Sequence, residues 1–112
     1  MIHMLSRFNL KSGIDPKVFA DRYLQLVAEM QSRNLAETSG PVGRRFANTP
    51  MDTDAPEAQE YYAVMIFRDA VQLNSAYAFM NSTQAHSADA KTHEFIKDAV
   101  ENPVFTCWQD IE

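Results

Sequence analysis

The chain has 112 residues, 46% of them hydrophobic and 22% charged, a composition typical of one globular domain spanning residues 1–112. Ten basic and fifteen acidic side chains leave a formal net charge of −5, and no basic cluster is longer than Arg44-Arg45. This charge repels phosphate backbones, so nucleic acid is excluded as an expected partner.

The cysteine count and the hydropathy pattern indicate the compartment. Cys107 is the lone cysteine, which excludes an intramolecular disulfide and favours a reducing environment. No apolar run approaches the roughly 20 residues of a membrane-spanning helix. His3 and Arg7 interrupt the apolar residues at the start of the chain, which predicts a strand there and not a signal peptide. We therefore expect a cytoplasmic protein with no membrane partner.

The first strand is predicted from Ile2 to Leu10, and a helix follows it. Asp15 supplies an N-cap acceptor, and Pro16 occupies the first helical position, where its missing N–H has no consequence. The next apolar residues recur with a 3.6-residue period, which predicts a core-facing helix that ends near Asn34. This stripe comprises Phe19, Tyr23, Leu26, Val27 and Met30.

A turn is predicted at residues 38–41, followed by a second strand from Val42 to Asn48. Gly43 and the two arginines make this strand the least apolar, so we expect it at a sheet edge. Residues 49–59 contain two prolines and three acids without periodicity, which predicts a loop between antiparallel strands. This loop is long for a connection between two antiparallel strands. We favour an insertion that the surface tolerates over a functional role as the explanation.

The second half of the chain repeats the pattern of the first. Residues 61–68 are apolar on both faces and predict a central strand. Asp69 and Gln72 resemble a capping box, and a further helical piece is expected from Ser87 to Val100. Asn102-Pro103 is expected to end this helix, and Val104 to Ile111 to form the last strand. The residues predicted to face the core from the two helices are Leu73, Ala76, Tyr77, Met80, Phe95, Ile96, Ala99 and Val100.

This βαββαβ order predicts a ferredoxin-like α+β fold, with a four-stranded antiparallel sheet and both helices on one face. The predicted strands carry bulky apolar side chains on both faces, whereas the helices cover only one of them. Apolar patches larger than a few hundred Å² usually mark an interface. We therefore expect a homodimer formed sheet to sheet.

The same features resemble a known group of proteins, the dimeric α+β barrel superfamily. The resemblance rests on the element order, the Gly13 to Pro16 entry into the first helix, Phe67-Arg68-Asp69 before the second, and the closing Asn102-Pro103-Val104-Phe105. Its small members include EthD-like and antibiotic-biosynthesis-monooxygenase-like proteins, and the chain looks most like uncharacterised small members. The resemblance implies two sheets packed into a barrel and a cavity between sheet and helices.

In that superfamily the cavity hosts oxygenation, isomerisation or dechlorination without a protein-bound cofactor, or binds haem. The resemblance therefore implies a cofactor-independent oxygenase or isomerase acting on a small aromatic or polyketide-like molecule. The alternative is a non-catalytic dimer that senses or carries a small molecule, because no specific catalytic motif is present. A haem-handling role is a third reading.

Two residues of the first strand are candidate catalytic groups. His3 and Arg7 share one side of the strand by its two-residue period. A histidine can accept a proton near neutral pH, and an arginine can hold a carboxylate or enolate with two hydrogen bonds. The alternative places both side chains in solvent near the strand ends.

The candidate substrate-binding residues are Arg45, Tyr62 and Trp108. Arg44 and Arg45 point to opposite faces of their strand, so only one of them can face a cavity, and salt pairing at the sheet edge is the competing role. Tyr62 and Trp108, like Tyr61, are large amphipathic groups that line pockets for planar molecules. They equally fill dimer cores.

No metal, nucleotide or other cofactor is expected. His86 and His93 are seven residues apart on a predicted helix, about 10.5 Å along its axis, too far for one zinc ion. Asp52, Asp54 and Glu57 lack the glycine and the spacing of a calcium loop. The three glycines form no nucleotide-binding motif.

Overall fold

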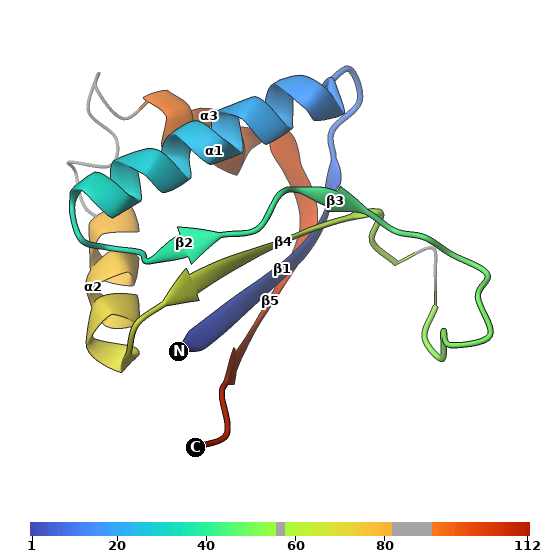
Figure 1. Ribbon diagram of the computed structural model, residues 1–112. Coiled ribbons are helices and arrows are strands. Elements are labelled where there is room, and N and C mark those ends of the chain that lie inside the picture. The colour runs from blue at the N-terminus through green and yellow to red at the C-terminus, as the bar shows by residue number, and fades with distance from the viewer. Residues whose placement is uncertain (56–57, 82–90) are drawn as a thin grey trace.

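The computed structural model describes residues 1–55, 58–81 and 91–112, which form an antiparallel sheet with helices packed on one side (Figure 1). The strands are β1 (Ile2–Leu10), β2 (Thr38–Ser39), β3 (Gly43–Arg44), β4 (Tyr61–Phe67) and β5 (Val100–Gln109). The helices are α1 (Pro16–Ser32), α2 (Ala70–Met80) and α3 (Lys91–Ala99). The sheet order is β2-β4-β1-β5, with β3 also paired to β4. The predicted ferredoxin-like fold is confirmed, and none of the described helices is long and apolar enough to cross a membrane.

The strand beside β4 is divided, which the sequence did not predict. From Ser39 to Gly43 the chain advances four residues, while their partners on β4 go back three, from Met65 to Tyr62. One extra residue is therefore accommodated in a bulge between β2 and β3, where Pro41 has no N–H to offer the ladder. The predicted bounds of 42–48 and the predicted turn at residues 38–41 are wrong for this reason.

Helix α1 forms as its sequence predicts. The Asp15 carboxylate accepts a hydrogen bond from the Lys17 N–H at 2.8 Å, and Pro16 is the first helical residue. The five residues of the predicted apolar stripe are buried against the sheet, with the Phe19 ring 5.2 Å from that of Phe8. Asn34 (φ 57°) lies just beyond the helix in the left-handed region, which asparagine tolerates better than most residues.

Helix α2 packs differently from its predicted stripe. Ala76 is buried, and Leu73 and Met80 pack against the core as expected, but the Tyr77 side chain is 72% exposed. Gln72 takes an inward position and is only 3% exposed. The expected start of the next helix at Ser87 lies outside the described residues.

Strand β5 begins at Val100, four residues earlier than predicted. Asn102 (φ 51°) and Pro103 lie within the strand, where the pairing of β1 with β5 shifts register between Arg7 and Asn9. The strand forms one edge of the sheet, and an edge tolerates a proline because half of its backbone groups have no ladder partner. The prediction that Asn102-Pro103 ends a helix is therefore wrong.

The register decides which face of the sheet meets the helices. Met4, Ser6 and Phe8 of β1 point toward the helices, and the alternate residues His3, Leu5 and Arg7 point to the other side. We call this second side the open face, because no described helix covers it (Figure 1). Cross-strand pairing places on it His3, Leu5, Arg7, Tyr62, Val64, Ile66, Val104, Thr106 and Trp108.

Candidate functional site

A cavity of about 360 Å³ lies between the sheet and the helices, and we call it the helix-side cavity. Its walls come from β1, β4, β5 and all three helices, because the side chains that face the helices from neighbouring strands meet there. Most of the lining is apolar, including Met4, Phe8, Phe19, Leu26, Met65, Met80, Ile96 and Phe105. Four polar side chains join this lining, namely Ser6, Tyr23, His93 and Lys97.

Tyr23 brings a neutral hydroxyl to this cavity. Its oxygen lies 2.8 Å from Ser39 Oγ, which is 2.9 Å from the Val64 carbonyl oxygen. The Gly40 carbonyl oxygen is equally near, and because carbonyls can only accept, Ser39 donates its hydrogen to them and Tyr23 donates to Ser39. Burial raises the pKa of Tyr23 above its usual value, so its phenol stays protonated across the physiological range.

His93 is the second polar group of note in the helix-side cavity. It lies on α3, and its side chain is 7% exposed. An imidazole can accept or donate a proton near neutral pH, so among the cavity-lining side chains His93 is the best suited to meet a polar atom of a bound molecule.

The five site residues predicted from the sequence do not line this cavity. Arg7, Arg45 and Tyr62 come together around a smaller pocket of about 160 Å³ next to β3 and β4. There the Arg45 guanidinium is held by two hydrogen bonds to the Asp54 carboxylate, at 2.9 and 2.5 Å, and Arg7 lies 3.9 Å from the same carboxylate. The hydrogen bond from Arg45 is the main cause of the lowered pKa of Asp54.

His3 and Trp108 are cross-strand neighbours at the other end of the open face. His3 Nε2 lies 2.9 Å from the Asp110 carboxylate, and this hydrogen bond is the main cause of the lowered pKa of Asp110. The Trp108 ring is 64% exposed, and its N–H donates to Thr106 Oγ1 at 3.0 Å.

The two predicted catalytic residues are far apart for a shared reaction centre. His3 and Arg7 are four residues apart on one strand, which separates their backbones by about 13 Å. A substrate that touches both has to span most of that length. Their catalytic roles, and the binding roles of Arg45, Tyr62 and Trp108, stay predictions.

Arg44 points to the helix side of its strand and not to the open face. Its guanidinium lies over the Tyr61 ring, 5.4 Å from the centroid, and 3.5 Å from the Glu60 carboxylate. Of the residues discussed as metal ligands, His86 lies outside the described residues, and Asp52 and Asp54 pair with Arg45. Within residues 1–55, 58–81 and 91–112, no three ligand side chains gather around a common point.

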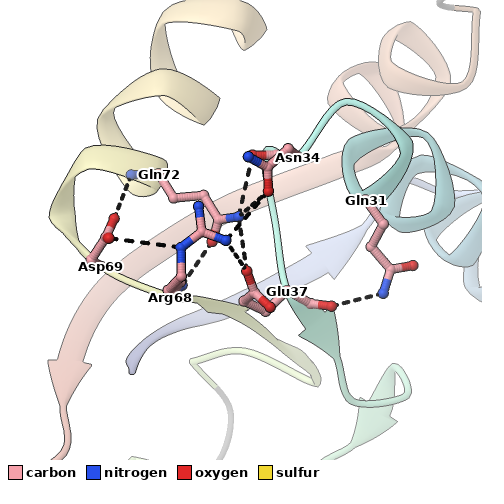
Figure 2. Close-up of polar contacts among 6 residues, drawn as sticks. All are labelled: Gln31, Asn34, Glu37, Arg68, Asp69 and Gln72. Carbon is pink, nitrogen blue, oxygen red and sulfur yellow. Dashed lines mark hydrogen bonds and ion pairs between the residues drawn. The ribbon is translucent and has the colours of Figure 1, made fainter.

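A polar network fixes the start of α2, as Figure 2 shows. Arg68 Nη1 donates to the Glu37 carboxylate at 2.6 Å, and the Gln72 amide donates to the Asn34 carbonyl oxygen and to Glu37, both at 3.2 Å. Gln72 Oε1 accepts from the Arg68 N–H at 2.7 Å, and Asp69 caps the helix by accepting from the Gln72 N–H. The network ties α2, which contributes Met80 to the helix-side cavity, to the connection between α1 and β2.

Comparisons with known proteins show which solved structures have a similar fold. No protein-family model and no curated protein sequence matches the chain. A solved structure of a protein from Arabidopsis thaliana matches with a TM-score of 0.72 at 10% identity, covering 100% of this chain and 97% of that one. A mutant of SnoaB, a cofactor-independent oxygenase from Streptomyces nogalater, matches with a TM-score of 0.61 at 12% identity, covering 99% and 93%.

A dimeric protein of unknown function and ferredoxin-like fold from Bacteroides fragilis also matches, with a TM-score of 0.53 at 10% identity, covering 97% of this chain and 95% of that one. At these identities the comparisons concern the fold. They confirm the predicted resemblance at the level of the fold, which is ferredoxin-like.

Proposed function

We propose that the protein binds a small, mainly apolar molecule in the helix-side cavity, and that it does so as a homodimer whose subunits meet through the open face. The cavity itself carries the proposal. Its volume of about 360 Å³ falls within the range of roughly 300–1,000 Å³ that ligand pockets occupy.

The chemistry of the walls indicates the kind of ligand. Apolar side chains surround most of the space, so the greater part of the molecule is a hydrocarbon or an aromatic ring system. His93, Tyr23 and Ser6 can each meet one polar atom, such as a hydroxyl or carbonyl oxygen. A small hydroxylated aromatic compound fits both requirements.

The homodimer rests on the composition of the open face. Leu5, Val64, Ile66, Val104 and Trp108 lie together there without a covering helix. Such a face is stabilised when it packs on a second apolar surface. The matching protein from Bacteroides fragilis is described as dimeric, which supports this arrangement.

The ligand proposal is tested by filling the cavity. Replacement of Ser6 by Phe places a bulky ring in the cavity, whereas Ser75→Phe adds the same ring on the exposed side of α2. Fluorescence titration with 1-naphthol should give saturable binding to the wild type and to Ser75→Phe, and a loss of binding in Ser6→Phe. Binding that is absent in the wild type, or that Ser6→Phe leaves unchanged, contradicts the proposal.

The dimer is tested by placing a charge on the open face. Trp108→Glu should shift the sedimenting species from twice the 12.7 kDa chain mass to the single chain mass, because a buried unpaired carboxylate is strongly unfavourable. Val71→Glu, at an exposed position on α2, is the control and should stay dimeric. A wild type that sediments as a folded monomer contradicts the proposed interface.

A second candidate is cofactor-independent oxygenation or isomerisation of a small hydroxylated aromatic compound, with the reaction either at the open face or in the helix-side cavity. The fold match to a cofactor-independent oxygenase supports it. In the assignment made from the sequence, His3 accepts the proton and Arg7 or Arg45 stabilises the resulting enolate, while Tyr62 and Trp108 shape the site. The contact of His3 with Asp110 supports this assignment, because a carboxylate orients an imidazole for proton transfer.

His93 offers the alternative base, because it lines the helix-side cavity. Oxygen uptake with a panel of hydroxylated aromatic compounds, without added cofactor, separates the two assignments. Loss of turnover in His3→Ala with retention in His93→Ala supports the open-face assignment, and the reverse supports the cavity. Retention of turnover in both variants contradicts catalysis by either histidine.

A cytoplasmic location belongs to the same proposal. The observation that supports it is the free and exposed thiol of Cys107, which suits a reducing compartment. Fractionation of cells producing the chain, with the protein recovered outside the cytoplasmic fraction, would contradict it.

A further inference from the structure

The described part of the connection between β3 and β4, residues 45–55 and 58–60, projects past the ends of these strands and away from the three helices (Figure 1). We call this segment the arm. It carries two large apolar side chains that contact little of their own chain, since Phe46 is 84% and Met51 88% exposed. These two side chains are the feature of the arm that requires an explanation.

Ion pairs and hydrogen bonds brace the base of the arm. Arg45 binds the Asp54 carboxylate with two hydrogen bonds and lies 3.3 Å from Asp52. Asp52 in turn accepts a hydrogen bond from the Thr49 N–H at 3.0 Å. Asn9 of β1 donates to the Ala58 carbonyl oxygen at 3.1 Å and so holds the part of the arm that leads into β4. Phe46 and Met51 are thus presented on a segment whose described residues are braced by these contacts.

We propose that the arm clasps a second copy of this chain, and that Phe46 and Met51 become buried against that copy when the open faces pack together. This inference rests on the proposed homodimer and extends it, because it assigns a partner-binding role to a segment outside the sheet. Ordered apolar side chains bind a partner at a low entropic cost, which suits them as anchors.

The area of the sheet supports this partner. The strands hold between two and ten residues each, lie about 4.8 Å apart and rise about 3.3 Å per residue, which gives the open face a flat footprint of roughly 500 Å². A stable interface buries about 800 Å² on each partner. Phe46 and Met51 lie outside this footprint and are largely exposed, so their burial adds apolar contact area to that of the sheet.

The arm is also continuous with the open face. A groove of about 500 Å³ is lined by Phe46, Met51 and charged residues of the arm together with Arg44 and Tyr62 of the sheet. Tyr62 itself belongs to the open face by its pairing with Arg7. Since Tyr62 belongs to both surfaces, a partner that covers the open face also reaches the groove. This continuity favours a second copy of the chain over an unrelated protein.

The test compares two double variants by sedimentation velocity over a dilution series. Phe46→Ser with Met51→Ser removes the apolar side chains of the arm, and Val71→Ser with Tyr77→Ser removes two exposed side chains from α2 as a control. The arm variant should raise the dimer dissociation constant at least about a hundredfold. The control variant should leave it unchanged, and near-ultraviolet circular dichroism should show that both remain folded.

A photo-crosslinking residue at position 51 gives a second measurement. Irradiation should produce a covalent species of twice the chain mass, with the crosslinked peptide mapping to the second chain, whereas the same residue at position 71 should give none. An arm variant that dimerises as tightly as the wild type overturns the inference, even where Trp108→Glu dissociates the dimer and the proposed interface stands. If Trp108→Glu stays dimeric while the arm variant dissociates, the arm is supported and the open-face interface is not.

Discussion

Gln72 is the buried centre of the network in Figure 2, and its replacement by alanine should destabilise the folded chain by about 3 kcal/mol. The change removes the acceptor of the Arg68 N–H and the donor to the Asn34 carbonyl oxygen. Leaving a buried polar group unpaired costs about 1–3 kcal/mol. The lower value applies to the Arg68 N–H and to the Asn34 carbonyl oxygen, because both residues are exposed to water. The lost packing of the Cγ methylene adds roughly 1 kcal/mol.

Urea denaturation followed by circular dichroism at one fixed protein concentration measures this change. With an unfolding entropy of about 2.1 cal/mol/K per residue over 112 residues, 3 kcal/mol corresponds to a decrease in Tm of about 13 °C. Gln25→Ala, at an exposed position on α1, is the matched control and should change the unfolding free energy by less than about 0.5 kcal/mol. If Gln72→Ala is indistinguishable from this control, the network does not stabilise the start of α2.

Two further predictions concern the ends of the sheet. Gly43→Ala should destabilise the protein by about 1 kcal/mol more than Gly40→Ala, as measured by thermal unfolding. The reason is that a Cβ at Gly43 overlaps the Tyr62 ring, whereas one at Gly40 meets open space. Equal effects of the two substitutions would show that the ring moves aside without cost. The hydrogen bond from His3 lowers the pKa of Asp110, so its stabilisation is present above the ordinary value of 3.8 and is lost as the pH falls through the lower folded value. The difference in unfolding free energy between wild type and Asp110→Asn should therefore shrink between pH 6 and pH 2, and a difference that grows on acidification would refute this coupling.

The sequence predicted those parts of the fold that depend on local signals. The cap at Asp15, the proline after it and the 3.6-residue stripe each act within one helix, and α1 follows all three. The two-sided apolar pattern of the strands likewise showed that the helices leave one face uncovered. It did not show which one, because residues on both faces of β1 have similar bulk, and only the register with β4 and β5 distinguishes them.

The errors arise where distant residues decide the outcome. Tyr77 was predicted inside and Gln72 only as a cap, because α2 is apolar on most sides and its local pattern is ambiguous. Gln72 is buried since Asn34 and Glu37, 38 and 35 residues away in the chain, satisfy its amide. The local signal of Pro103 predicts a helix end, whereas the edge strand β5 accommodates this proline.

The candidate site was harder to predict for the same reason. His93 was considered only as a metal ligand, and Tyr23 only as part of a core stripe. Both line the helix-side cavity because α1, α3 and three strands meet there, and no local pattern carries that information. The signal available in the sequence was a polar or amphipathic side chain on a core-facing helix position, which occurs at both residues.

The location of the ligand on the helix side is tested most directly by the methyl NMR signals of the six methionines. Met4, Met65 and Met80 line the helix-side cavity, whereas Met51 lies on the arm. When 1-naphthol is added to protein labelled with carbon-13 at the methionine methyl groups, ring currents should shift the signals of the three cavity residues and leave Met51 in place. Shifts confined to Met51, or none at saturating ligand, would contradict the account.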